Sequence, residues 1–319
     1  MKIAIIGNGP AGFYCAERLI KNSDSDITVS IFDKEQTSIY SKIRLPDFIA
    51  GKIDKDTLLL KTDTTSKIDF HHGEEVISID SVKKTIKSKK DTYTYDKLIL
   101  AMGGYPFIPP IPGSNLENVF ALRTLSDAKK IREKALKSKT AVIIGGGVLG
   151  LELAVALDSL GVKVSVVEVM PRLLANVLSE EDSVKLAKKM KESGIVSYVD
   201  QALTLLEKEG NSLKLSFKDN KEPLIADMVI FNTGIRCQTN LSEGDIPQKG
   251  RGFIVDTHFL TSLPDVYGIG DCAEHDGKPG GLWVSAKSQG EYLADILTGK
   301  KNEYDFPAFP IRIKLPFKI

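Results

Sequence analysis

The stretch KIAIIGNGPAG, residues Lys2 to Gly12, decides the fold of this chain. It begins with an apolar run rich in β-branched residues, which predicts a strand, and continues into a Gly-x-Gly-x-x-Gly turn. A helical pattern follows from Phe13 to Lys21, and a second apolar run from Ile27 to Phe32 ends on Asp33. This order of strand, glycine turn, helix, strand and acid is typical of a βαβ unit that binds a dinucleotide.

Each glycine of the turn has a physical role in such a unit. Gly7 would make the tight turn, Gly9 would let the backbone approach a pyrophosphate, and Gly12 would let the helix pack closely on the strand. The pyrophosphate would lie at the helix N-terminus, where free N–H groups and the helix dipole favour an anion. Asp33 would accept hydrogen bonds from a ribose. The alternative is a glycine-rich turn that binds no ligand.

A second copy of the motif favours the dinucleotide interpretation. Its glycine turn, GGGVLG, begins at Gly145, which lies 138 residues after Gly7. The turn follows an apolar run from Thr140 to Ile144, and a helical pattern and a further apolar run lead from it to Glu168. The distance between the copies places each in its own domain. A carboxylate at Glu168 would hydrogen-bond the 2′-OH of NADH and repel the 2′-phosphate of NADPH, so NADH is expected.

Composition indicates an ordinary globular protein. The chain has 319 residues, enough for two cores, with 43 Lys and Arg against 42 Asp and Glu and a net charge of +1. This balance argues against a nucleic-acid or membrane partner, and no apolar run approaches the length of a membrane span. The sequence enters its first predicted strand at once, so we expect no signal peptide and a cytoplasmic location.

The cysteines and histidines indicate no metal site. Cys15, Cys237 and Cys272 lie far apart, and neither a zinc-ligand spacing nor a CxxC pair is present. His71 and His72 fall in a predicted strand, where neighbouring side chains point to opposite faces, so both are interpreted as structural.

The remaining segments give a coarse order of elements. Residues 34–60 read as irregular, and 68–95 read as a β-meander. A buried strand then runs into Gly103-Gly104, and several prolines between Pro106 and Pro112 predict a domain boundary. A helix is expected after Ser126 as its N-cap. A strand over 226–232 ends at Thr233-Gly234, a strand at 266–269 leads into Gly270-Asp271, and a helix runs from about Val284 to Gly299.

With two such fingerprints, two strands ending at glycine and a late Gly-Asp pair, the chain resembles the FAD-dependent pyridine nucleotide–disulfide oxidoreductase superfamily. The segment from Tyr40 to Leu45 and the short length look most like NADH:rubredoxin oxidoreductases and the flavin module of NADH nitrite reductase large subunits. The resemblance implies an α/β fold with two Rossmann-like, glutathione-reductase-like domains. An FAD-binding domain would comprise 1–105 and 237–300, an NAD(P)H-binding domain 106–236, and a tail 301–319 would stand where relatives continue into a C-terminal interface domain.

The resemblance also implies the site residues. FAD and NADH would be held by the residues of the two glycine turns, the strand ends and the late Gly-Asp: Gly7, Gly9, Pro10, Ala11, Gly12, Asp33, Lys34, Ala101, Gly103, Arg123, Gly145, Gly147, Val148, Leu149, Gly150, Glu168, Thr233, Gly234, Gly270 and Asp271. The residues near the reacting rings would be Lys42, Arg44, Glu152 and Trp283. The alternatives are surface charge for Lys42 and Arg44, a core aromatic for Trp283 and an exposed first-turn acid for Glu152.

The resemblance suggests a hydride transfer from NADH to the flavin N5, followed by electron transfer to an external carrier such as rubredoxin. Related oxidases, peroxidases and coenzyme A–disulfide reductases use a cysteine where Ser41 stands here, and a serine cannot form a sulfenic acid or mixed disulfide. No redox-active cysteine is therefore expected. The alternatives are a redox-sensing module that binds both cofactors with little turnover and an NADH oxidase-like enzyme. Because the tail 301–319 is too short to build the interface domain, a monomer is expected, or a weak dimer through another surface.

Overall fold

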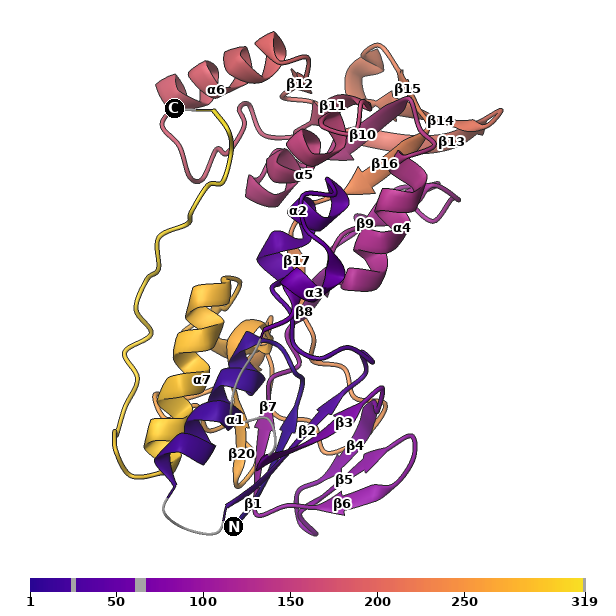
Figure 1. Ribbon diagram of the computed structural model, residues 1–319. Helices are drawn as coiled ribbons and strands as arrows, with labels where there is room; N and C mark the ends of the chain where they lie inside the picture. Colours follow the sequence, from indigo (N-terminus) through magenta and orange to yellow (C-terminus); the bar gives the residue numbers. More distant parts are fainter. Residues whose placement is uncertain (24–26, 61–66, 318–319) are drawn as a thin grey trace. The chain divides into compact units, whose positions relative to one another are not determined.

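The computed structural model describes residues 1–23, 27–60 and 67–317, and the chain forms two compact units (Figure 1). The first unit consists of Met1–Tyr40, Leu59–Tyr105 and Arg236–Pro310. The second consists of Ser41–Leu58, Pro106–Ile235 and Ile311–Ile319. The divisions after Tyr105 and after Ile235 lie beside the boundaries expected from the sequence. Ser41–Leu58 and the segment after Pro310 differ, since both group with the second unit.

The first unit is built on a five-stranded parallel sheet. Its order is β20 (Val266–Gly268), β7 (Lys97–Leu100), β1 (Lys2–Ile6), β2 (Thr28–Asp33) and β3 (Ile68–His72). Side chains alternate between its two faces, as the period of a strand requires. Ile3 and Ile5 enter one buried cluster with helix residues, whereas Ala4 and Ile6 enter a second cluster. Burial on both faces explains why these strands read as continuous apolar runs.

Helices α1 (Pro10–Asn22) and α7 (Trp283–Leu297) lie side by side in the first unit (Figure 1). Their backbones approach so closely that a Cβ on Gly290 would lie 2.2 Å from the carbonyl oxygen of Ala11. At the far end of the pair, the buried Asp295 carboxylate accepts hydrogen bonds from Arg18 Nε at 2.8 Å and Asn22 Nδ2 at 2.6 Å. These contacts join the first helix of the chain to the last.

Replacing Asp295 by alanine should lower the free energy of unfolding by about 1–3 kcal/mol, because the change removes the acceptor of several hydrogen bonds. Burial raises the pKa of Asp295, but the bonds from Arg18 and Asn22 outweigh it and hold that pKa below the ordinary 3.8. A depressed carboxylate pKa stabilises the fold above its unfolded value, and the contribution is lost as pH falls through the folded value. In urea unfolding, the difference in the free energy of unfolding between the wild type and Asp295→Ala should therefore be constant from pH 7 to about pH 4. Below about pH 4 this difference should become smaller. A difference that is largest in acid would contradict this assignment.

Three short antiparallel strands flank the parallel sheet: β4 (Val76–Asp80), β5 (Thr85–Ser88) and β6 (Thr92–Thr94), with β18 (Glu243–Gly244) beside β4. β4, β5 and β6 form the predicted meander, but over a shorter range than 68–95, because Ile68–His72 is β3 of the parallel sheet. A further small sheet contains β19 (Phe253–Ile254), β21 (Ala273–His275) and β22 (Lys278–Pro279).

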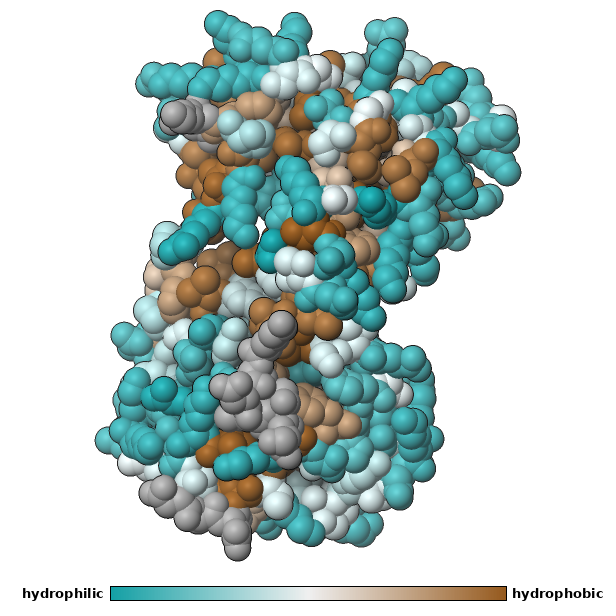
Figure 2. Space-filling view, viewed as in Figure 1, coloured by the Kyte–Doolittle hydropathy of each residue, from teal (hydrophilic) through white to brown (hydrophobic). Residues whose placement is uncertain are grey.

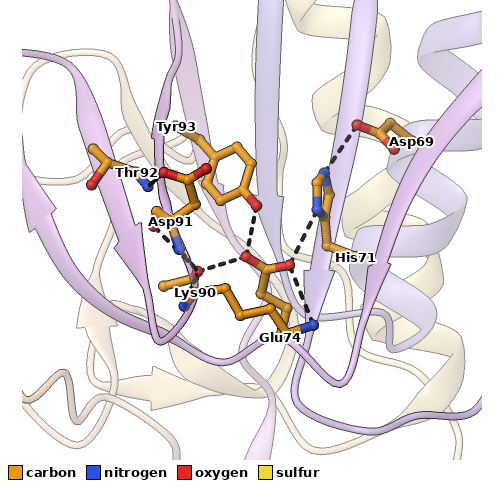
Figure 3. Close-up of polar contacts among 8 residues, drawn as sticks. Asp69, His71, Glu74, Lys90, Asp91, Thr92 and Tyr93 are labelled. Atoms are coloured by element: carbon orange, nitrogen blue, oxygen red, sulfur yellow. Dashed lines mark hydrogen bonds and ion pairs between the residues drawn. The ribbon is translucent and has the colours of Figure 1, made fainter.

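A polar cluster joins the meander to β3 (Figure 3). The Glu74 carboxylate is buried and accepts hydrogen bonds from Ser88 Oγ at 2.6 Å and Tyr93 OH at 2.7 Å. His71 lies between Glu74, at 3.3 Å, and Asp69, at 2.9 Å, and its ring stacks on Phe32. Burial raises the pKa of Glu74, but these hydrogen bonds and His71 bring it below its usual value. His71 therefore has partners that account for its position within the fold.

The second unit contains another five-stranded parallel sheet. Its order is β12 (Val196–Tyr198), β11 (Lys163–Val167), β10 (Thr140–Ile144), β16 (Met228–Phe231) and β9 (Val119–Ala121). Helices α4 (Leu125–Ala135), α5 (Val148–Asp158) and α6 (Glu180–Glu192) accompany it, and β13 (Leu203–Glu209), β14 (Ser212–Phe217) and β15 (Leu224–Ala226) form an antiparallel sheet. Strands β8 (Gly104–Pro106) and β17 (Ile235–Cys237) pair where the chain passes between the units.

Several local expectations were wrong. Helix α4 begins after Thr124 rather than Ser126, because the Thr124 side chain and Asp127 form a reciprocal capping box. The strand expected over 226–232 is the shorter β16, and Ala226 instead ends β15. Residues 34–60 contain short helices rather than an irregular chain: η1 (Lys42–Arg44), α2 (Leu45–Ile49) and α3 (Lys55–Leu58). In the tail expected over 301–319, residues 311–315 have no helix or strand assignment.

Hydrophilic residues cover most of the visible surface, and hydrophobic residues appear there in small separate patches (Figure 2). Within the described ranges, none of the helices combines the length and apolarity needed to cross a bilayer. The same residues contain no group of three or more His, Cys, Asp or Glu side chains arranged to hold a metal ion.

Candidate functional site

The glycine turn of the first unit is shaped by close backbone contacts. Gly7 has a φ of +111°, and a Cβ on it would lie 2.2 Å from the carbonyl oxygen of Ala101. A Cβ on Gly12 would lie 2.1 Å from the carbonyl oxygen of Gly7. Gly9 differs, because a Cβ there would meet no described atom within 4 Å. Two of the glycines are thus required by the fold itself, and the third leaves open space above the helix.

That open space lies at the N-terminus of α1. Gly9 is the N-cap and offers no side chain, and within the described structure no other side chain caps this end or places an acid in the first turn. The first N–H groups of the helix and its dipole therefore favour an anion. Asn8, 5% exposed, has both side-chain polar atoms buried without a hydrogen-bond partner among the described residues. Unpaired buried amide atoms beside a free helix end fit a polar ligand.

The acid at the end of β2 is directed toward the same turn. Asp33 accepts a hydrogen bond from Asn8 N at 3.3 Å and another from Glu35 N at 3.0 Å. Lys34, the next predicted contact residue, is exposed.

The late Gly-Asp pair also lies beside this turn. Gly270, in the short helix η4 (Gly270–Cys272), donates its N–H to the buried Gln289 Oε1 at 2.7 Å. A Cβ on Gly270 would lie 2.9 Å from Ala11 Cβ, which places the pair next to the first turn of α1. Asp271 follows directly, and Trp283 begins α7 within the same unit. Gly103, whose φ is +71°, accepts a hydrogen bond from Gln238 N.

The second unit repeats the arrangement. Gly145 has a φ of +115°, and a Cβ on it would lie 2.2 Å from the carbonyl oxygen of Asn232. A Cβ on Gly150 would lie 2.2 Å from the carbonyl oxygen of Gly145, whereas one on Gly147 would meet nothing described within 4 Å. The N-terminus of α5, which begins with Val148 and Leu149, has no side-chain cap in the described structure. The two turns therefore offer the same kind of anion site.

Glu168 directly follows β11, and Asp33 is the last residue of β2, so the two acids have equivalent places in the two units. Its Oε2 accepts a hydrogen bond from Gly146 N at 2.6 Å, and its Oε1 accepts one from Met170 N at 2.8 Å. Arg172, which could have drawn a 2′-phosphate, donates instead to the carbonyl oxygen of Leu178. These two hydrogen bonds hold the carboxylate of Glu168 at the glycine turn.

Replacing Glu168 by glutamine should lower the preference for NADH over NADPH about 10-fold. The amide makes weaker hydrogen bonds than a charged acceptor, for which one bond contributes about 1.5–3 kcal/mol, and it no longer repels a phosphate. Dissociation constants for NADH and NADPH measured on both proteins would check this. An unchanged ratio would mean that Glu168 does not select the cofactor.

The remaining predicted residues are held by other contacts. Thr233 Oγ1 donates to the carbonyl oxygen of Phe107, and Gly234, with a φ of +95°, accepts from Phe107 N. Arg123 N donates to Asp127 at the start of α4. Lys42 and Arg44 lie in η1, and Arg44 Nη1 donates to the carbonyl oxygen of Thr57 at 3.3 Å.

Glu152 lies on α5, two residues after Gly150, and is half-buried. It borders a cavity of about 300 Å³ whose walls come from η1, α2 and the residues after it, α5 and the segment after Pro310. Lys42, Arg44 and Glu152 all belong to the second unit, whereas the sequence had suggested that the first two belong to the FAD-binding domain.

The sequence profile of the family named pyridine nucleotide-disulphide oxidoreductase matches residues 1–290. The chain belongs to this family. Its members are flavoprotein oxidoreductases that bind FAD and NADH, and the two glycine turns of the chain fit two dinucleotides. The predicted resemblance is confirmed.

The family includes several similar proteins of known name. The nitrite reductase [NAD(P)H] large subunit of Klebsiella oxytoca is 32% identical over 98% of this chain, which spans only 33% of that protein. The nitric oxide reductase FlRd-NAD(+) reductase of Aliivibrio fischeri is 29% identical over 99% of the chain and 84% of its own length. The chain spans about a third of the length of the nitrite reductases it matches.

Solved structures in the family agree on the fold. NADH:rubredoxin oxidoreductase from Clostridium acetobutylicum has a TM-score of 0.81 at 27% identity, covering 98% of this chain and 79% of that one. Ferredoxin reductase from Rhodopseudomonas palustris has a TM-score of 0.87 at 26% identity, covering 95% and 78%. The predicted α/β fold with two Rossmann-like units is confirmed.

The three cysteines of this chain are free thiols, and the pKa of each is raised. Cys15 and Cys272 are fully buried, which raises the pKa of Cys15 strongly and that of Cys272 to about 12. Burial and the nearby Asp271 raise the pKa of Cys237 as well. Reactive cysteines usually have a lowered pKa, whereas the pKa of each of these three is raised.

Proposed function

We propose that this chain binds FAD in its first unit and NADH in its second and catalyses NADH-dependent flavin reduction. One observation carries the proposal: both units present an open glycine at an uncapped helix N-terminus, and a strand-end acid anchored to the same turn. FAD would be held by Gly9, Asp33 and Asp271, and NADH by Gly147 and Glu168. The flavin and the nicotinamide supply the hydride chemistry, and the protein supplies binding, orientation and exclusion of water.

Anaerobic mixing of the FAD-loaded protein with NADH tests this function. The visible absorbance of the oxidised flavin should disappear within the first seconds after mixing. One NADH should be consumed for each flavin that is reduced. A flavin that binds but stays oxidised would favour the alternative of a redox-sensing module. Rapid consumption of oxygen by the reduced protein would favour the NADH oxidase-like alternative.

We propose further that the electrons leave to a small redox carrier of the rubredoxin type. The support comes from the named relatives, a rubredoxin oxidoreductase and an FlRd-NAD(+) reductase. Lys42 and Arg44 would attract an acidic carrier, mainly by raising the association rate. A monomer and a cytoplasmic location, both expected from the sequence, stay predictions that light scattering and cell fractionation would test.

Replacing all three cysteines by alanine should leave electron transfer from NADH to rubredoxin at the wild-type rate, because none of the thiols has a lowered pKa. The measurement is rubredoxin reduction under steady-state conditions, with the FAD content of each protein determined first. Loss of carrier reduction in a variant that still binds FAD and is still reduced by NADH would show that a cysteine relays electrons.

A further inference from the structure

The segment after Pro310 docks on the second unit through one of its sides. Its exposure alternates along the chain: Arg312, Lys314 and Pro316 are exposed, and Ile313, Leu315 and Phe317 between them are half-buried. A period of two is the pattern of an extended chain with one side against a surface. Leu315 and Pro316 form part of the wall of the 300 Å³ cavity, opposite residues of α2 and α5.

A hydrogen bond joins the backbone of this segment to a side chain of α5 in the same unit. Lys314 N donates to Glu152 Oε1 at 3.2 Å. Among the described residues, the Glu152 carboxylate accepts no other hydrogen bond, so its second oxygen is available to a ligand. Glu152 follows the glycine turn within the first turns of α5, and it borders the cavity.

The charges around Glu152 give Lys314 a second effect. Burial raises the pKa of Glu152, and Asp47 raises it further, whereas the N–H and the positive charge of Lys314 lower it. Besides Glu152, Asp47 and Lys314, the cavity wall contains one further charged residue among those described, Lys52. Loss of the bond from Lys314 would therefore move the titration of Glu152 to higher pH.

We propose that Lys314 is a positioning residue, whose backbone N–H orients the Glu152 carboxylate to accept a hydrogen bond from the carboxamide of the NADH nicotinamide. A carboxylate accepts and a primary amide donates, so the two groups are complementary. The inference rests on the proposed function, because it requires that NADH binds in the second unit. It adds a site residue that lies 162 positions from its partner.

Lys314→Pro removes the donor and suits a segment that is already extended. Arg312→Pro is the matched control, because it places the same residue on the same exposed side, where no hydrogen bond of Arg312 N is seen within the described structure. With FAD-loaded proteins, Lys314→Pro should weaken NADH binding about 10-fold and leave binding of ADP-ribose, which lacks nicotinamide, unchanged. Arg312→Pro should bind both as the wild type does. Lys314→Ala, which keeps the N–H and loses the charge, should fall between.

The pH dependence of NADH binding distinguishes this proposal from a purely structural role of Lys314, which would not change it. The pH below which NADH binding weakens should rise in Lys314→Pro, and Glu152→Gln should abolish that dependence. In a Glu152→Ala background, which has no acceptor for the Lys314 N–H, Lys314→Pro should have no further effect on NADH binding.

Equal weakening of NADH and ADP-ribose in Lys314→Pro, or NADH binding equal to that of the wild type, would overturn the inference. A wild-type protein that fails to bind NADH would instead overturn the proposed function.

Discussion

Replacing Gly9 by valine should leave the first unit folded but weaken FAD binding by about 10- to 100-fold. The residue has φ −83° and ψ −175°, a conformation that valine adopts readily, and a Cβ there meets no described protein atom within 4 Å. The added methyl groups would fill the space where the pyrophosphate approaches the backbone. Overpacking of this kind costs about 1–3 kcal/mol, and each 1.4 kcal/mol is a factor of ten.

The second unit supplies the matched control. Gly147 has the same backbone conformation, φ −79° and ψ 177°, and the same open space. Gly147→Val should retain FAD and lose NADH affinity by a similar factor, whereas Gly9→Val should lose FAD. Calorimetric titration of both cofactors and circular dichroism of both apoproteins would measure this. If both variants lost the same cofactor, the assignment of one dinucleotide to each turn would be wrong.

Replacing Gly290 by valine should destabilise the first unit by about 3 kcal/mol or more and release FAD as a consequence. Its Cβ would lie 2.2 Å from the Ala11 carbonyl oxygen and 3.1 Å from Cys15 N, so α1 and α7 would have to separate. Backbone atoms cannot rotate away as a side chain can, which places the cost at or above the usual range for overpacking. The N-terminus of α1 would move with the helix.

Gly281→Ala is the control for this variant, because its Cβ would meet nothing described within 4 Å. Thermal unfolding followed by flavin fluorescence and by circular dichroism would separate the two effects. Gly290→Val should release flavin at a much lower temperature, and Gly281→Ala should unfold as the wild type does. A Gly290→Val protein with wild-type stability would mean that the helices do not pack as closely as described.

The two turns could be predicted from sequence because their chemistry is local. Gly7 and Gly12 are fixed by contacts within one βαβ unit, and the Asp33 carboxylate accepts hydrogen bonds from Asn8 N and Glu35 N, both close to the turn or to Asp33 in sequence. Backbone conformation, strand period and helix dipole depend on residues that lie close together in sequence, so a short sequence motif is enough to predict them. The start of α4 was harder to predict, because both Thr124 and Ser126 are suitable N-cap residues. Thr124 is the N-cap because Asp127 lies three residues after it and completes the capping box.

The parts that could not be predicted depend on contacts between distant residues. Gly290 reads as an ordinary helical glycine until Ala11 is placed against it. The segment Ser41–Leu58 lies between two strands of the first unit in sequence, yet α2 packs on α4 and α5 of the second unit. Lys314 carries no motif, and only its hydrogen bond to Glu152 distinguishes it from the other lysines near the C-terminus.

The division of each unit into several chain segments has a consequence for the order of assembly during synthesis. β20 forms one edge of the first parallel sheet, and its residues are synthesised long after β1, β2 and β3. This sheet therefore stays incomplete until β20 has been made. All strands of the second parallel sheet lie between Val119 and Phe231. Closing a sheet from nearby strands costs less chain entropy than closing one from distant strands. The unit that contains the middle of the chain is therefore expected to mature on the ribosome before the unit that contains its beginning.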